Sequence, residues 1–223
     1  MWKLAERKPS WGFKKMFVYL KYQQGYGCNH KRIYRVYCEL KVNLLVKPRK
    51  QLPLREPQPL AQSQAANQSW SLDFMSDSLA SGHPFCTLNI IDDFNREALW
   101  IEIDTSLPAE RIIRILYVLA TLWGYPKQIR LDNGPELISQ KMAAWAAAHA
   151  VELAYIQPGK PAQNAYIERF NNIFREAVLD AHLFSSLHEA REITAEWVEE
   201  YNAVRPHEAL QNRSPYQHVA EYA

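Results

Sequence analysis

The order of extended and helical segments in residues 68–204 constrains the fold of this chain most strongly. Three extended segments come first, the last two joined by a hairpin turn, at residues 69–74, 85–92 and 98–103. Apolar periodicity then predicts alternating helices and short strands at 108–123, 127–131, 137–148, 151–156, 164–180 and 187–204. A strand meander followed by such alternation predicts an α/β fold, with a mixed five-stranded sheet flanked by helices.

The residues before this core divide into a small helical module and a linker. Within residues 1–46, apolar spacing predicts helices at 10–22 and 30–40 around a glycine-rich turn, with Asn29 capping the second. The pair resembles a helix-turn-helix, although a plain helical hairpin would look the same. Residues 47–67 carry four prolines and little apolar periodicity, which is typical of a linker. The core is expected to span residues 68–215, with 216–223 as a tail.

Basic residues are concentrated at the N-terminal end of the chain. Residues 1–56 hold 14 Lys and Arg against 3 Asp and Glu, whereas residues 57–223 hold 12 against 21. A basic head on an acidic body indicates that the head meets a polyanion such as nucleic acid. The alternative is a solvated surface whose charges are unevenly shared.

Several classes of protein are disfavoured by simple features of the sequence. No apolar run approaches the ~18 residues of a membrane span, and no apolar signal core follows the N-terminus. The three cysteines stand at no metal-ligand spacing, so a structural zinc site is not expected. These features favour an intracellular protein with reduced thiols and without a membrane segment.

Three acidic residues occupy positions where carboxylates often carry chemistry. Asp73 lies in an apolar strand, where a charge is costly unless it is paired or binds a metal. Asp132 follows the short strand at 127–131, at the carboxyl end where α/β proteins tend to place their sites. Glu168 lies near the start of the helix at 164–180, on its polar stripe. Taken singly, Asp132 could simply open an Asp-Asn-Gly turn, and Glu168 could be an ordinary exposed acid.

The joint spacing of these three favours them over Asp92 and Asp93, which precede a hairpin and are better explained by turn chemistry. Between Asp73 and Asp132 there are 58 residues, and between Asp132 and Glu168 there are 35. Their surroundings resemble the IS-three family of bacterial insertion-sequence transposases, whose signature is Asp, Asp and Glu with 35 residues between the last two. The resemblance covers residues 68–215, and more weakly 25–46, through motifs at 72–77, 89–97, 130–136, 159–171 and 201–207.

The resemblance implies a ribonuclease-H-like fold, a retroviral-integrase-like core and a DNA transposase activity. Phosphodiester transfer requires positioning of the reacting groups and neutralisation of charge on the phosphate. Two Mg²⁺ (or Mn²⁺) ions about 3.5–4 Å apart can supply both. The hypothesis is that Asp73 bridges both ions, while Asp132 and Glu168 each complete one. Water would first release a 3′-OH at the transposon end, and that 3′-OH would then attack a second phosphodiester.

The partner implied by the resemblance is double-stranded DNA, as the terminal inverted repeats of the transposon and as target DNA. The family comparison also implies a circular intermediate, and synapsis of two ends makes a homo-oligomer on nucleoid DNA in the bacterial cytoplasm the expected assembly. Contacts to DNA are expected from residues near the third carboxylate and on the second N-terminal helix: Lys160, Gln163, Asn164, Arg169, Asn172, Arg175, Lys31, Arg32 and Arg35. For Lys160 and Arg169, plain surface charge is an equal alternative.

The head departs from the family pattern. Gly27 and Cys28 follow Tyr26 at once, as if a stretch between the two helices were missing, and no additional upstream helix-turn-helix is present. The chain is therefore interpreted as a second-frame product or a shortened copy, acting with an upstream-frame DNA-binding protein or fusion. Two rival functions are a catalytically silent DNA-binding regulator and a ribonuclease-H-like metal nuclease that cuts without strand transfer.

Overall fold

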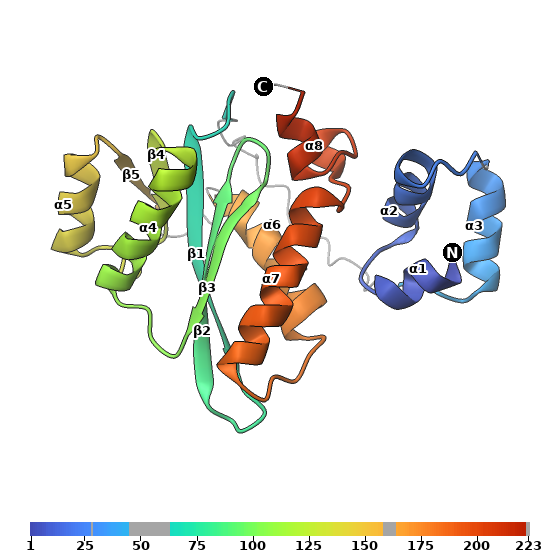
Figure 1. Ribbon diagram of the computed structural model, residues 1–223, viewed down its shortest axis with the longest axis horizontal. Helices are drawn as coiled ribbons and strands as arrows, with labels where there is room; N and C mark the ends of the chain where they lie inside the picture. The colour runs from blue at the N-terminus through green and yellow to red at the C-terminus, as the bar shows by residue number, and fades with distance from the viewer. Residues whose placement is uncertain (28, 45–62, 158–163, 222–223) are drawn as a thin grey trace.

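A computed structural model describes residues 1–27, 29–44, 63–157 and 164–221, and its centre is a twisted five-stranded sheet (Figure 1). The strands are β1 (Ser69–Ser78), β2 (Pro84–Asp92), β3 (Ala98–Asp104), β4 (Gln128–Leu131) and β5 (Glu152–Tyr155). Their order is β3-β2-β1-β4-β5. The β1–β2 and β2–β3 pairs are antiparallel, whereas the β1–β4 and β4–β5 pairs are parallel. The predicted mixed five-stranded sheet is confirmed.

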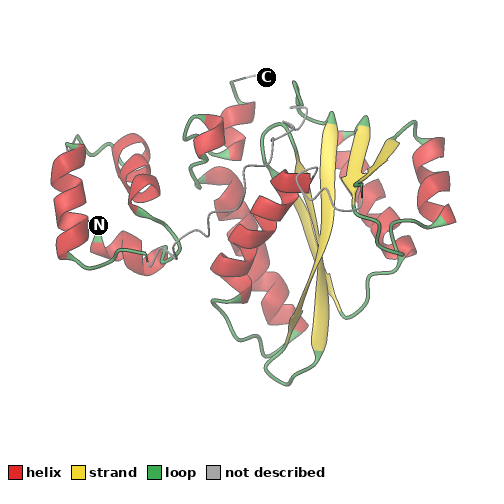
Figure 2. Ribbon diagram, turned by 180° about the vertical axis from the view of Figure 1, so that it is seen from behind, coloured by secondary structure: helices red, strands yellow, loops and turns green. Residues whose placement is uncertain are grey.

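Helices cover both faces of this sheet (Figure 2). They are α4 (Ala109–Trp123), α5 (Gln140–Ala148), α6 (Ala165–Phe174) and α7 (Leu187–Ala203), and a further helix, α8 (Pro215–Val219), packs against α7. Trp70 and Leu72 of β1 belong to the apolar core under α4 and α5, whereas Met75 belongs to the core under α6 and α7. This division follows from the alternation of side chains along a strand. None of the helices in the described ranges is long and apolar enough to cross a membrane.

The structure differs from the sequence-based expectation at three places in the core. Strand β1 continues to Ser78 rather than ending at residue 74. The helix predicted at 164–180 changes after α6 into a π-helical segment, η3 (Arg175–Leu179). Residues 215–219 form the short helix α8, whereas the sequence predicted a tail from residue 216. Ser214 and Gln217 form a reciprocal capping box at its start, and α8 packs against α7.

A helical module lies beside the core, at the right of Figure 1. Its elements are α1 (Trp2–Arg7), α2 (Phe13–Val18), the π-helical η1 (Tyr19–Gln23) and α3 (His30–Glu39). Buried Trp11, Met16 and Tyr37 form its apolar centre. The Asn29 side chain accepts a hydrogen bond from the Lys31 backbone N–H at 2.9 Å, as expected for the cap of the second helix. The short helix α1 was not predicted.

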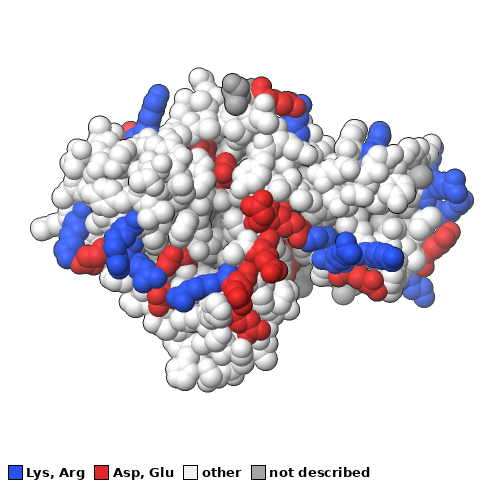
Figure 3. Space-filling view, viewed as in Figure 1, with Lys and Arg blue, Asp and Glu red and all other residues white. Residues whose placement is uncertain are grey.

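The module contacts the end of α7 and the residue that follows it. The side-chain amide of Gln23 donates to the Val204 carbonyl at 2.9 Å, and Lys8 forms an ion pair with Glu200. Val204 also packs against the apolar centre of the module. On the face shown in Figure 3, Lys and Arg lie over the N-terminal helices and also over α4 and α5, and Asp and Glu form a band over α7 between them. Residues 47–62, which make up most of the predicted linker, lie outside the described residues, as do residues 45 and 46.

Candidate active site

Asp73 lies in β1, the central strand of the sheet, and Asp132 directly follows β4, the parallel strand beside it. In the β1–β4 pair, Ser71 is opposite Arg130. Two further residues along each chain therefore bring Asp73 and Asp132 to the same level and the same face, because alternate residues share a face. Adjacent strands lie about 4.8 Å apart. Strand register thus explains how two carboxylates 58 residues apart in the sequence become neighbours.

Two hydrogen bonds hold the carboxylate of Asp73. One oxygen accepts from the Phe74 backbone N–H at 2.9 Å, and the other accepts from the Asn171 side-chain amide of α6 at 2.7 Å. The Asn171 carbonyl oxygen accepts in turn from the amide of Asn89 at 2.7 Å. Asn89 is buried in β2, directly opposite Asp73 in the strand pairing. Sequence reasoning did not assign a role to either asparagine, although a buried Asn in an apolar strand is a signal of a polar partner.

The three predicted carboxylates act on one another electrostatically. The pKa of Asp73 is raised to about 6, chiefly by burial and also by the negative charges of Asp132 and Glu168. The hydrogen bonds from Phe74 and Asn171 lower this pKa and only partly compensate. Among the ion pairs of the described residues, none involves any of the three carboxylates. Among the described residues, the site therefore concentrates negative charge without a cationic side chain paired to it.

Asp132 and Glu168 are less constrained than Asp73. An Asp132 carboxylate oxygen accepts from the Gly134 backbone N–H at 3.1 Å, so the residue also makes the predicted turn. Glu168 lies in the first turn of α6 with its side chain exposed. Within the described ranges, no three His, Cys, Asp or Glu side chains are close enough to hold a metal ion together. The carboxylates thus share one electrostatic site but do not form a closed ligand shell.

The competing acids Asp92 and Asp93 have structural roles, as their place before a hairpin predicted. The carboxylate of Asp93 is buried, accepts hydrogen bonds from the hydroxyls of Ser69 and Ser71 at 3.0 and 2.6 Å, and forms an ion pair with Arg130 at 3.2 Å. Asp92 accepts from the backbone N–H groups of residues 67 and 94 at 2.6 and 2.7 Å. The partners at residues 67, 69 and 71 tie the hairpin to the start of β1, and the ion pair ties it to β4.

The predicted DNA-contacting residues near Glu168 differ in how available they are. Arg169 and Asn172 are exposed on α6. Asn164 is buried at the start of that helix. Arg175 donates to the Ser76 carbonyl of β1 at 3.1 Å and lies 3.9 Å from a carboxylate oxygen of Asp180, so its guanidinium is partly committed within the protein. The predicted contacts Lys160 and Gln163 lie outside the described residues.

The three basic residues predicted to contact DNA from the N-terminal module lie on α3. Lys31, Arg32 and Arg35 are all exposed. Arg35 lies 3.7 Å from Glu39, one helical turn later, and this exposed pair reduces its local charge. Lys31 and Arg32 therefore present the freer positive charges on this helix.

Comparison with known proteins places the chain among insertion-element proteins. Two models of the integrase core domain match it, over residues 63–161 and 149–215. It is 37% identical over 219 residues to the insertion element IS476 uncharacterized 39.2 kDa protein of Xanthomonas euvesicatoria, covering 98% of this chain but 63% of that protein, just under two thirds. It is 38% identical over 219 residues to the insertion element IS407 uncharacterized 31.7 kDa protein of Burkholderia multivorans, covering 98% and 79%.

Solved structures share the fold at low sequence identity. A chain in the cryo-EM structure of the simian T-cell lymphotropic virus intasome in complex with PP2A regulatory subunit B56 gamma has a TM-score of 0.63 at 15% identity, covering 97% of this chain and 73% of that chain. The HTLV-2 integrase catalytic core domain in complex with magnesium has a TM-score of 0.55 at 18% identity, covering 69% and 97%. The predicted ribonuclease-H-like fold is confirmed. The chain belongs to the insertion-sequence transposase family with an integrase-like core.

Proposed function

We propose that this chain is a DNA transposase that cleaves transposon ends and joins them to a second DNA site, with Asp73, Asp132 and Glu168 as its catalytic carboxylates. The observation that carries the proposal is the raised pKa of Asp73, to which the other two carboxylates contribute across three separate elements of an integrase-like core. Perturbed carboxylates that converge on one face are typical of catalytic sites. Family membership supports the reaction class, and the electrostatic effect of Asp132 and Glu168 on Asp73 supports the choice of residues.

The donor chemistry of the three side chains fits a hard divalent cation. All three offer carboxylate oxygens, the ligands that Mg²⁺ prefers, and no described Lys or Arg is paired with them. Glu168 is exposed, so its side chain can change rotamer to join the other two. We infer two Mg²⁺ (or Mn²⁺) ions, held through Asp73 together with Asp132 and Glu168. When bound, such ions supply charge neutralisation on the phosphate and activation of the attacking oxygen.

The chain's own contribution to the reaction is positioning. Hydrogen bonds from the Asn171 amide and the Phe74 backbone N–H hold the two oxygens of Asp73, so this carboxylate would present its oxygens to a metal ion in one orientation. In the first step, a water oxygen forms a bond to phosphorus and the bond to the 3′ oxygen breaks, which leaves a free 3′-OH. In the second step, that 3′ oxygen forms a bond to a new phosphorus, and the 3′ oxygen of the attacked strand leaves with a proton. One site can serve both steps, because both attacking groups are oxygens.

The partners of the reaction belong to the same proposal. The substrates would be the terminal inverted repeats of the transposon and a target duplex. A homo-oligomer would bring two ends together, and an upstream-frame DNA-binding protein or fusion would contribute recognition of those ends. The proposed location is the bacterial cytoplasm, on nucleoid DNA.

The test is cleavage and joining of a labelled duplex that carries the element's end, in Mg²⁺ and separately in Mn²⁺. Wild-type protein should give a 3′ nick and joined products, and Asp132→Asn should give neither. Glu136→Gln is a matched control, since it removes an exposed carboxylate from the same loop. Nicking without joining would indicate a metal nuclease of this fold. Binding without cleavage, in both metals, would indicate a silent DNA-binding regulator.

A further inference from the structure

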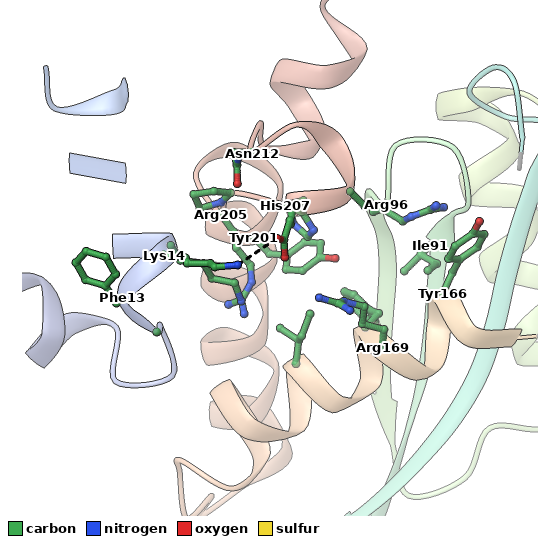
Figure 4. Close-up of a pocket in the computed structure, with 17 residues that line it drawn as sticks. Phe13, Lys14, Ile91, Arg96, Tyr166, Arg169, Tyr201, Arg205, His207 and Asn212 are labelled. Carbon is green, nitrogen blue, oxygen red and sulfur yellow. Dashed lines mark ion pairs between the residues drawn. The ribbon is translucent and has the colours of Figure 1, made fainter. Parts of the chain in front are cut away.

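A cavity lies between the N-terminal module and the core, apart from the three carboxylates. Its volume is about 370 Å³. One wall comes from the start of α2, and the others come from the β2–β3 hairpin, from α6 and from the chain that follows α7 (Figure 4). The lining is rich in cationic and polar side chains: Lys14, Lys15, Arg96, Arg169, Arg205 and His207. The proposed catalytic function makes no use of this cavity.

Two of these guanidinium groups each have a buried nitrogen without a hydrogen-bond partner among the described residues. Arg205 is 4% exposed, and its Nε has no hydrogen-bond partner. One terminal nitrogen of Arg96 is likewise buried and unpartnered. The Arg96 guanidinium lies 3.4 Å from the ring centroid of Tyr166, which orients it beside the cavity. A buried cationic donor without a partner is costly, so the arrangement indicates a ligand that supplies acceptors.

The positive charges of the cavity are poorly balanced within the protein. Arg96, Arg169 and Arg205 form no ion pair with any carboxylate of the described residues. The one ion pair at the cavity, between Lys14 and Glu208 at 3.6 Å, joins two largely exposed side chains. It therefore contributes little to balancing the buried guanidinium groups.

The effect of this charge is visible in a neighbouring amine. The pKa of Lys15 is lowered to about 8, chiefly by burial and also by the charges of Arg205 and Arg169, while Glu176 and Glu208 act in the opposite sense. A lysine whose positive charge is disfavoured by its surroundings is stabilised when an anion enters. An anion in the cavity would therefore stabilise the charged forms of the Lys15 amine and of both arginines.

We propose that this cavity binds a phosphate group, through the guanidinium groups of Arg96, Arg169 and Arg205. Planar guanidinium forks match the oxygens of a phosphate, and the charge assistance makes such hydrogen bonds strong. The group could be a phosphodiester of duplex DNA or a free phosphate ion. Arg169 follows Glu168 on α6, so a bound phosphodiester would lie next to the catalytic helix. Because the walls come from both parts of the chain, occupancy would also fasten the module to the core. The proposal stands whether or not the chain is catalytic.

The first experiment is calorimetric titration of inorganic phosphate into the full chain at constant ionic strength. Wild type should show saturable binding, and Arg169→Gln and Arg96→Asn should each bind at least about tenfold more weakly. Asparagine suits position 96, because the backbone there has φ 62°. Arg114→Gln, which removes an exposed guanidinium from α4 on the opposite side of the sheet, should bind like wild type. General stabilisation by phosphate through solvent exclusion would act equally on all four proteins. Thermal melting of each variant checks that it is folded.

The second experiment identifies the source of the phosphate, using a short fluorescein-labelled duplex of arbitrary sequence. If the cavity takes a phosphodiester, Arg96→Asn and Arg169→Gln should weaken duplex binding by about tenfold, and inorganic phosphate should compete at constant ionic strength. If it takes a free ion, phosphate should bind without altering duplex affinity. The proposal is overturned if the variants match wild type in both experiments, or if Arg114→Gln loses as much affinity as they do.

Discussion

The carboxylate of Asp73 is oriented by an amide that reaches it from a helix on one face of the sheet. Asn171 donates to Asp73 and accepts from Asn89, so one side chain of α6 satisfies polar groups of two strands. Asn171 is 8% exposed, and water has little access to replace these bonds. Such outer partners of a ligating carboxylate fix its orientation and tune its affinity for the cation.

We expect Asn171→Ala to slow end cleavage about 10- to 100-fold and to raise the Mg²⁺ concentration needed for half-maximal rate, because Asp73 loses its orienting partner. The measurement is a single-turnover cleavage assay over a range of Mg²⁺ concentrations. Gln140→Ala removes an exposed amide from α5 and should behave like wild type. A variant with a reduced rate but an unchanged Mg²⁺ dependence would indicate that Asn171 serves packing alone.

Individual carboxylates of the site could be predicted from sequence, but their partners could not. Asp73 interrupts an apolar strand, and Asp132 follows the end of another, so each is conspicuous in its own local pattern. The bond between Asp73 and Asn171 joins residues 98 positions apart. It depends on where α6 crosses the sheet, and helical periodicity identifies a polar stripe without identifying the strand that it meets.

His207 makes a separate prediction about stability in mild acid. Burial lowers the pKa of its imidazole from 6.5 to about 3, helped by the nearby charges of Arg205 and Lys15. As pH falls below 6.5, the unfolded chain gains a proton at this residue while the folded protein does not. The free energy of unfolding therefore falls as pH drops from about 6.5 to about 3, and it is fully retained above 6.5. The slope from one such group is at most about 1.4 kcal/mol per pH unit.

His207→Gln should therefore flatten the pH dependence of urea unfolding between about pH 6 and pH 4. His188→Gln changes an exposed imidazole on α7 and should leave the wild-type slope in place. The interpretation would be wrong if both variants retained the same slope, because the acid sensitivity would then come from other groups.

Helix α7 is joined to the sheet by the side-chain amide of Asn202, which makes two hydrogen bonds with the backbone of β3. The Asn202 amide donates to the Ala98 carbonyl at 2.9 Å, and its oxygen accepts from the Ala98 backbone N–H at 2.9 Å. Both partners are buried, and the pairing lies where the β2–β3 register shifts between Ile90 and Ile91. The amide thus satisfies edge backbone groups of β3 that would otherwise lack partners.

We expect Asn202→Ala to lower the free energy of unfolding by about 2–4 kcal/mol, because it leaves two buried backbone groups unsatisfied. Urea denaturation followed by circular dichroism measures the change. Glu196→Ala, an exposed substitution on the same helix, should stay within about 0.5 kcal/mol of wild type. A loss for Asn202→Ala no larger than that of the control would show that solvent replaces the two bonds.

The existence and order of the core elements from β1 to α7 followed from the sequence, because periodicity and turn residues are local signals. The π-helical segment η3 did not, since the extra residue per turn at Arg175 lies inside an uninterrupted apolar pattern. Helix α8 could have been found. Its Ser-Pro start with Gln217 at the third helical position is a capping signal that short length and the nearby chain end obscured.

For the whole molecule, charge is distributed unevenly between the N-terminal module and the core. Lys31 and Arg32 are exposed on α3, whereas a band of acidic side chains covers α7 between the module and the rest of the core (Figure 3). The sequence predicted this asymmetry from composition alone. It could not predict how the module docks, since the bond from Gln23 to Val204 spans 181 positions.

The last prediction concerns the salt dependence of DNA binding. If α3 contacts phosphates, each lysine or arginine that does so releases about 0.9 counterions. The double variant Lys31→Gln, Arg32→Gln should therefore reduce the slope of log affinity against log salt concentration by about two, measured by fluorescence anisotropy with a labelled duplex. The double variant Arg114→Gln, Lys127→Gln removes the same charge from exposed positions of the core and should leave the slope unchanged. If both double variants kept the wild-type slope, the basic residues of α3 would be simply solvated surface. If both lowered the slope equally, only net charge would matter.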